Sequence, residues 1–137
     1  MFDMVRDVAA LIGRIGVGVV FLAHGWQKVT EWGLDGTARA FEGMGVPLPT
    51  ASAWFAAIVE LVGGALLIAG AALPVVGVLL ALDMLGALII VHLPNGLLGQ
   101  GGYELVLVLG VAAIALGFNG GSLTVDRLIR RRRPAAV

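Results

Sequence analysis

Residues 51–93, ASAWFAAIVELVGGALLIAGAALPVVGVLLALDMLGALIIVHL, decide the fold of this chain. The stretch holds two apolar runs of about 20 residues, and each is long enough to cross the hydrocarbon core of a bilayer as a helix. A tight turn from Gly70 to Pro74 separates the runs, and proline is well suited to the first turn of the second helix. The sequence therefore predicts two antiparallel, neighbouring membrane helices at about 51–71 and 74–93.

Two further apolar runs lie on either side of this stretch. Residues 8–29 form a long run, and residues 103–118 form a shorter one that we expect to extend at its ends. The polar stretch 31–50 is long enough for a short surface helix at about 36–44. We therefore predict a single all-α domain. It is an integral membrane four-helix bundle with up-down-up-down topology and a short surface helix in the first outer loop.

The composition agrees with a membrane protein. Of the 137 residues, 59% are hydrophobic and only 13% are charged, whereas soluble domains carry about 25% charged residues. The formal net charge is zero, so the charge does not point to nucleic acid as a partner. The chain contains no cysteine, which excludes a disulfide, a thiolate-bound iron–sulfur cluster and a dithiol redox centre within it.

Charged and aromatic residues indicate the orientation in the membrane. Arginines gather after Asp126, and Arg6 precedes the first helix, whereas the opposite side holds only Lys28 and Arg39. By the positive-inside rule, both termini should be cytoplasmic, with 119–137 as a basic cytoplasmic tail. This tail either anchors the topology or also docks a cytoplasmic partner. Four aromatic residues lie at the predicted outer interface, where such rings concentrate: Trp26, Trp32, Trp54 and Tyr103.

Three charged residues, Arg14, Glu60 and Asp83, lie inside successive apolar runs. A charge in hydrocarbon is costly unless it is paired or neutralised. A rise of about 1.5 Å per residue places the two acids at one level near the midplane, with Arg14 slightly below. We expect a buried polar cluster centred on Arg14, with one carboxyl neutral at pH 7 because one guanidinium balances only one carboxylate. The cluster either fixes the helix register or binds a proton or a ligand.

A second polar set gathers at the outer helix ends. His24 and Lys28 are four residues apart and share a helix face, while His92 ends the third membrane helix. Tyr103 and Glu104 begin the fourth. Because alternate helix ends meet on one side of a bundle, these five residues could converge on an outer polar pocket, or they could reach the headgroups as interfacial residues. Two histidines alone do not indicate a haem, and we expect no metal site.

Four pieces of the chain together resemble the DoxX family of small bacterial membrane proteins. They are RIGVGVVFLAHGWQK at Arg14–Lys28, ELVGGALLIAG at Glu60–Gly70, Asp83-Met84, and His92–Gly96 followed by Gly102-Tyr103-Glu104. The resemblance runs from about Val8 to Phe118 and implies a four-helix bundle in the bacterial inner (plasma) membrane. It matches the family's recurring polar positions, among which no catalytic residue is settled: Arg14, His24, Lys28, Glu60, Asp83 and Glu104.

The resemblance also implies a class of activity. Some members of the family are implicated in thiosulfate oxidation coupled to quinone. Others are linked to a membrane oxidoreductase complex with a superoxide dismutase and a sulfurtransferase-type thiol enzyme, in defence against oxidative stress. The leading hypothesis is therefore a subunit or scaffold of a membrane redox assembly that contacts quinone and has no thiol chemistry of its own.

Two alternatives remain open at this point. The first is a small-molecule binder or proton-linked carrier, which would form a homo-oligomer because four helices are few for a carrier. The second is a purely structural membrane subunit, in which the buried charges only specify the bundle.

Overall fold

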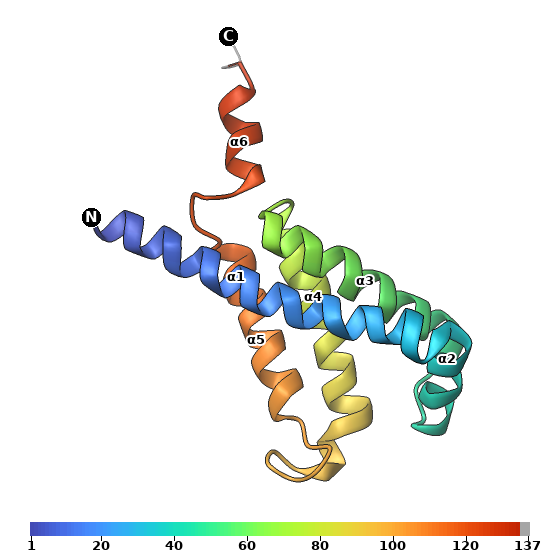
Figure 1. Cartoon of the computed structure of the whole chain (residues 1–137). Helices are drawn as coiled ribbons and strands as arrows, with labels where there is room; N and C mark the ends of the chain where they lie inside the picture. Colours follow the sequence, from blue (N-terminus) through green and yellow to red (C-terminus); the bar gives the residue numbers. More distant parts are fainter. Residues whose placement is uncertain (135–137) are drawn as a thin grey trace.

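In the computed structural model, which describes residues 1–134, the chain folds into helices joined by short connections, and these residues contain no strand (Figure 1). The predicted all-α class is confirmed. Residues 135–137 of the predicted basic tail lie outside the described part. The elements in chain order are α1 (Phe2–Trp26), the π-helical turn η1 (Gln27–Glu31), α2 (Gly33–Gly43), α3 (Pro49–Ala69), α4 (Leu73–Ala87), the π-helical turn η2 (Leu88–His92), the 3₁₀ turn η3 (Leu93–Asn95), α5 (Glu104–Phe118) and α6 (Val125–Arg132).

Three helical segments are long and apolar enough to cross a membrane. They comprise α1 with η1, α3, and α4 with η2 and η3, with mean hydropathies of 1.8, 1.9 and 2.5. Helix α5 is equally apolar in character but has only 15 residues, a length of about 22 Å. The fourth predicted helix is therefore present but shorter than the hydrocarbon core of a typical bilayer.

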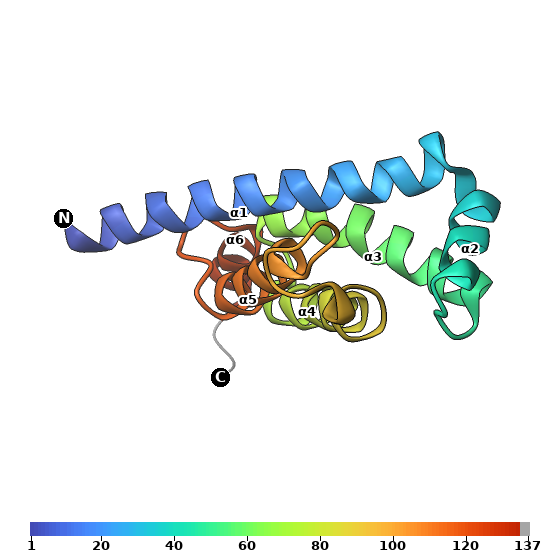
Figure 2. The ribbon, with the colours of Figure 1, turned by 90° about the horizontal axis from the view of Figure 1, so that it is seen from below.

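The long helices are arranged as two pairs. In both views α1 runs along α3, and α4 runs along α5 (Figures 1 and 2). The pairs meet where α3 packs against α4, and they cross at an angle, so that the far ends of α3 and α4 diverge (Figure 1). The two pairs therefore do not run parallel to each other (Figure 1).

Glycines bring the backbones within each pair into direct contact. A Cβ added to Gly18 of α1 would lie 2.8 Å from the carbonyl oxygen of Gly64 in α3. In the other pair, a Cβ on Gly77 would lie 2.6 Å from the Ala113 carbonyl oxygen and 2.8 Å from the Gly117 Cα. Only glycine permits such an approach, and small residues at helix contacts are the usual means of close packing in membranes.

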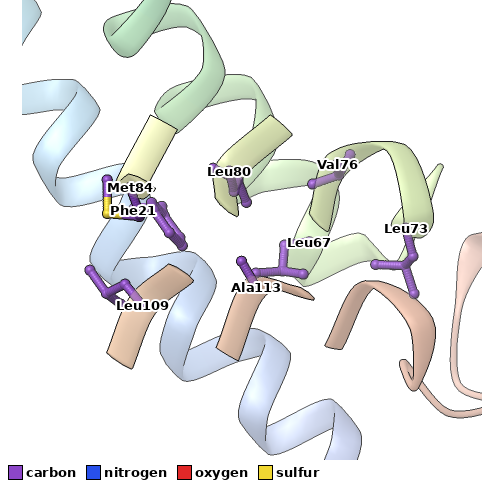
Figure 3. Packing of buried hydrophobic residues seen from close by; sticks show 8 residues of the cluster. All are labelled: Phe21, Leu67, Leu73, Val76, Leu80, Met84, Leu109 and Ala113. Atoms are coloured by element: carbon purple, nitrogen blue, oxygen red, sulfur yellow. The ribbon is translucent and has the colours of Figure 1, made fainter. Parts of the chain in front are cut away.

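A hydrophobic cluster joins all four long helices. Its buried members interdigitate where the two pairs meet, so this contact is the core of the fold. Figure 3 labels these side chains, which are Phe21, Leu67, Leu73, Val76, Leu80, Met84, Leu109 and Ala113.

At the opposite end from α2, the segment after α5 is tied to the other helices by hydrogen bonds. The Asp126 carboxylate accepts from the backbone N–H groups of Ala72, at 2.7 Å, and Leu73, at 3.0 Å. It therefore satisfies unpaired donors at the start of α4. The Ser122 backbone N–H and hydroxyl both donate to the carboxylate of Asp7 in α1. These contacts hold the two helix pairs together on the side of the termini.

Candidate functional site

A cavity of about 580 Å³ lies between the two helix pairs. Its walls come from α1, η1, α2 and α3 on one side and from α4, η2 and α5 on the other. They are mainly apolar and rich in rings, as Phe21 of α1, Phe41 of α2 and Phe55 of α3 illustrate. Sites for small organic molecules typically enclose about 300–1,000 Å³ behind such walls.

The hydrophobic core closes one end of this cavity. Phe21, Met84 and Leu109 belong to the core cluster and also line the cavity, and they lie close together at one end of the cluster in Figure 3. The cavity is thus sealed toward the α6 end of the molecule. Its other end lies under α2 and the connection between α4 and α5, where Gly101 and Gly102 contribute to the lining.

A buried ion pair forms the polar part of the lining. The Lys28 Nζ lies 2.8 Å from the Glu60 Oε2, and the two residues are only 8% and 3% exposed. Both line the cavity. A pair so far from solvent is stable only when its charges balance each other, because each ion alone loses its hydration.

Asp83 lies next to this pair. It lies on α4, which packs against the helix that carries Glu60, and it lines the same cavity. The Oδ2 atom of Asp83 is buried and has no hydrogen-bond partner among the described residues. The lining therefore contains one ammonium group and two carboxyl groups among mainly apolar residues.

Two π-helical turns flank the cavity and carry polar residues toward it. Lys28 lies in η1, directly after α1, and His92 closes η2 at the end of α4. The buried Thr37 of α2 donates its hydroxyl to the Lys28 carbonyl oxygen at 3.0 Å, which fixes α2 against η1. A π-helical turn rotates the following side chains relative to a regular helix and is frequent at functional sites.

Both histidines of the chain line the cavity in a defined orientation. The His24 Nδ1 lies 2.8 Å from the Val20 carbonyl oxygen, and the His92 Nδ1 lies 2.7 Å from that of Gly101. A carbonyl oxygen only accepts, so Nδ1 carries the proton in each ring. The Nε2 atoms are then proton acceptors in the neutral rings.

Arg14 lies elsewhere, and the prediction of a cluster centred on it is wrong. Its guanidinium donates to the carbonyl oxygens of Ile68 at 3.0 Å, Leu67 at 3.4 Å and Leu123. The reason is the register of α1 and α3. Gly18 lies against Gly64, so Arg14 is level with the C-terminal end of α3, about 12 Å along the helix from Glu60. Helix C-termini attract cations because their last carbonyl groups lack partners.

The outer polar set is divided in the structure. His24, Lys28 and His92 line the cavity together with Glu60 and Asp83, so the two predicted groups are not separate. Tyr103 and Glu104 do not belong to the lining, and Glu104 is exposed at the start of α5.

Sequence reasoning missed the contribution of α2 to the cavity wall. Two apolar residues on the expected surface helix, Phe41 and Met44, could have indicated that this helix covers a cavity, because both line it.

Among residues 1–134, no three His, Asp or Glu side chains are grouped closely enough to hold a metal ion. The acids and histidines are spread along the cavity instead. An amphipathic organic molecule matches the lining better, because apolar walls would cover its ring or tail and the ion pair would hydrogen-bond its polar atoms.

Comparison with known proteins identifies the family of this chain. Residues 9–93 match the model of the DoxX family. A Bacillus subtilis protein named "Putative oxidoreductase CatD" is 36% identical over 110 residues, which cover 80% of this chain and 79% of that protein.

Two further relatives carry names that refer to membranes. The "Uncharacterized membrane protein Rv3486" of Mycobacterium tuberculosis is 35% identical and covers 89% of this chain and 82% of its own length. The Escherichia coli "Inner membrane protein YphA" is 32% identical over 66% of this chain and 64% of its own length. No solved structure matches the chain significantly. The chain therefore belongs to the DoxX family and is an integral membrane protein.

Proposed function

We propose that this protein is the membrane subunit of a redox assembly and that its cavity binds the ring of a quinone-type electron carrier. In this proposal the four long helices form an up-down-up-down bundle in the bacterial inner membrane, with both termini in the cytoplasm. The assembly would serve defence against oxidative stress. Its thiol and metal chemistry would reside in partners such as a superoxide dismutase and a sulfurtransferase-type enzyme, because this chain has no cysteine.

The observation that carries the proposal is the buried Lys28–Glu60 pair on the wall of an apolar cavity within the membrane-spanning helices. A quinone is a flat apolar ring with two carbonyl oxygens. Phe21, Phe41 and Phe55 provide surfaces against which such a ring can pack. The ammonium group of Lys28 has N–H donors beyond the one directed at Glu60, and a carbonyl oxygen of the ring can accept from them.

The name of the Bacillus subtilis relative supports the redox part. That protein is named a putative oxidoreductase, and it is 36% identical to this chain over 110 residues. The match covers 80% of this chain and 79% of that protein, which supports a common class of activity for the two.

Fluorescence provides a direct test of quinone binding. Of the three tryptophans, Trp32 lines the cavity and Trp26 and Trp54 do not, while their exposed fractions are 49%, 63% and 50%. A variant with Trp26→Phe and Trp54→Phe therefore keeps the one tryptophan that lies in the cavity wall. We expect saturable quenching of Trp32 by a short-chain naphthoquinone in nanodiscs. A variant that retains only Trp54 should show no saturable component.

Two substitutions assign the binding to the ion pair. Glu60→Gln should weaken the naphthoquinone affinity about tenfold, because the charge that holds Lys28 in place is lost. The control Glu104→Gln changes an exposed acid outside the cavity and should leave the affinity unchanged. Linear quenching without saturation in the single-Trp32 protein would refute the proposed function.

A proton-linked carrier for a small molecule is the second candidate. It is favoured by one observation, namely that Glu60 and Asp83 line the same cavity from two different membrane-spanning helices. Reconstituted liposomes with an internal pH dye would test it. Substrate-dependent proton flux that is lost in Asp83→Asn would favour the carrier over the redox subunit, and the absence of flux with any candidate substrate would count against it.

A further inference from the structure

We infer that the cavity also opens sideways into the hydrocarbon of the membrane, between α3 and α4, and that its ligand carries a hydrocarbon tail that leaves through this opening. Gly86 of α4 keeps the opening free. The identity of the ligand's polar ring rests on the proposed function. The opening adds the class of ligand, a lipid-dissolved molecule with a tail, and the route by which that molecule enters.

Some side chains belong both to the cavity wall and to the outer surface of the molecule. Phe55 of α3 and Leu82 of α4 line the cavity, and yet they are 47% and 55% exposed. Ile90 of η2 also lines the cavity and is exposed. By contrast, Phe21 and Met84 line its sealed end and are buried. The wall is therefore incomplete at the three exposed side chains.

The helix contacts show which side of the molecule this gap faces. Gly64 of α3 lies against α1, and Phe55 precedes it by nine residues. Gly77 of α4 lies against α5, and Gly86 follows it by nine residues. Nine residues are about two and a half helical turns, so Phe55 and Gly86 lie on the faces turned away from α1 and α5. Because both line the cavity, the gap lies between α3 and α4.

The gap lies at the depth of the hydrocarbon. Helices α3 and α4 belong to segments that are long and apolar enough to span a membrane. Leu82 is the tenth residue of α4, which places it about 14 Å along that helix and near the middle of a hydrocarbon core about 30 Å thick. The opening therefore meets acyl chains rather than water.

Gly86 leaves this opening unobstructed. It lines the cavity, and a Cβ added to it would meet no heavy atom of residues 1–134 within 4 Å. The glycines that join helices differ, since a Cβ on Gly77 would lie 2.6 Å from the Ala113 carbonyl oxygen. Gly86 is four residues from both Leu82 and Ile90, so the three share one helix face. Gly86 therefore lies at the centre of the rim, and the space beside it is available to a ligand.

The chemistry of the walls identifies the occupant. The Lys28–Glu60 pair gives the interior of the cavity a polar site, whereas Phe55, Leu82 and Ile90 give the rim an apolar surface. A ligand that fits both has a polar ring for the ion pair and a hydrocarbon tail that extends between α3 and α4. Lipid tails are as apolar as these side chains, so the tail can continue from the rim into the bilayer without exposing apolar surface to water.

Two ligands with the same ring test the inference. The probes are a naphthoquinone without a tail and the same ring with a tail of several isoprene units. Quenching of the single-Trp32 protein in nanodiscs gives both dissociation constants, each expressed as a mole fraction in the lipid. In Gly86→Phe, the ratio of the tailed to the tailless constant should rise about tenfold, because the added ring fills the opening and the tail must overpack it.

Gly16→Phe is the matched control for Gly86→Phe. Gly16 lies on α1 outside the cavity lining, and an added Cβ there also meets nothing within 4 Å among the described residues. The ratio of the two constants should not change in this variant. Saturable binding of the tailless ring alone, or an unchanged ratio in Gly86→Phe, would overturn the sideways opening and leave the proposed function standing.

If neither naphthoquinone binds, the proposed function fails, and contact with lipid decides the inference. Gly86→Trp is then made in a protein whose three native tryptophans are replaced by phenylalanine, and it is placed in nanodiscs of phospholipid with brominated acyl chains. Bromine quenches a tryptophan that touches the chains. Quenching as strong as that of Gly16→Trp, at an exposed position of α1, supports the opening. Quenching far below that of Gly16→Trp shows a closed wall and overturns it.

Discussion

Arg14 shows how a single buried charge can serve the fold rather than the cavity. The side chain is fully buried, yet its partners are carbonyl oxygens at the end of α3 and in the segment before α6. One side chain thereby connects α1, the end of α3 and the chain that follows α5. Loss of such a side chain would leave several buried acceptors without donors.

Replacing Arg14 should therefore reduce stability and spare binding. We expect Arg14→Met to lower the free energy of unfolding by about 3 kcal/mol, because the buried carbonyl groups lose charged donors. Arg39→Met is the control, since Arg39 is exposed. Unfolding in increasing mole fractions of SDS would measure the difference. An Arg14→Met protein of unchanged stability, or a folded one with altered naphthoquinone affinity, would contradict this assignment.

At the scale of the element, the glycine contacts determine how the helices of each pair approach. The membrane segments could be predicted from the sequence, because a run of about 20 apolar residues is typical of a membrane-spanning helix. The sequence also identified Arg14, Glu60 and Asp83 as costly residues in such runs, and it placed Lys28 in a separate polar set at the outer helix ends. It could not pair them, because a partner depends on the register of α1 against α3 and on the rotation introduced by η1, which the apolar pattern does not encode.

The register makes a prediction for Gly18. A Cβ at this position would lie 2.8 Å from the Gly64 carbonyl oxygen and 2.5 Å from the Ile68 Cγ1. Gly18→Ala should force α1 away from α3 and cost about 2 kcal/mol in the same SDS unfolding assay. Gly16→Ala is the matched control on the same helix, because nothing lies within 4 Å of its added Cβ. Equal stability of the two variants would show that the close approach is not required.

At the scale of the whole molecule, the two ends of the helix assembly differ in chemistry. The end with both termini carries α6, in which Arg130, Arg131 and Arg132 follow one another and are exposed. The other end carries α2 and the open part of the cavity. Arginines remain on the cytoplasmic side of membranes, so the cavity should open toward the outer leaflet. In this orientation a lipid-soluble ligand would enter the cavity from the outer side.

Cysteine labelling tests that orientation without a background, because the chain contains no cysteine. Gln100→Cys introduces a thiol in the connection between α4 and α5, and Arg133→Cys introduces one just beyond α6; both positions are exposed. In intact spheroplasts, a membrane-impermeant maleimide should label Gln100→Cys and leave Arg133→Cys unmodified. Arg133→Cys should react once the membrane is permeabilised, since its thiol is then accessible from both sides. The reverse pattern in intact spheroplasts would place the cavity opening on the cytoplasmic side and contradict the predicted orientation.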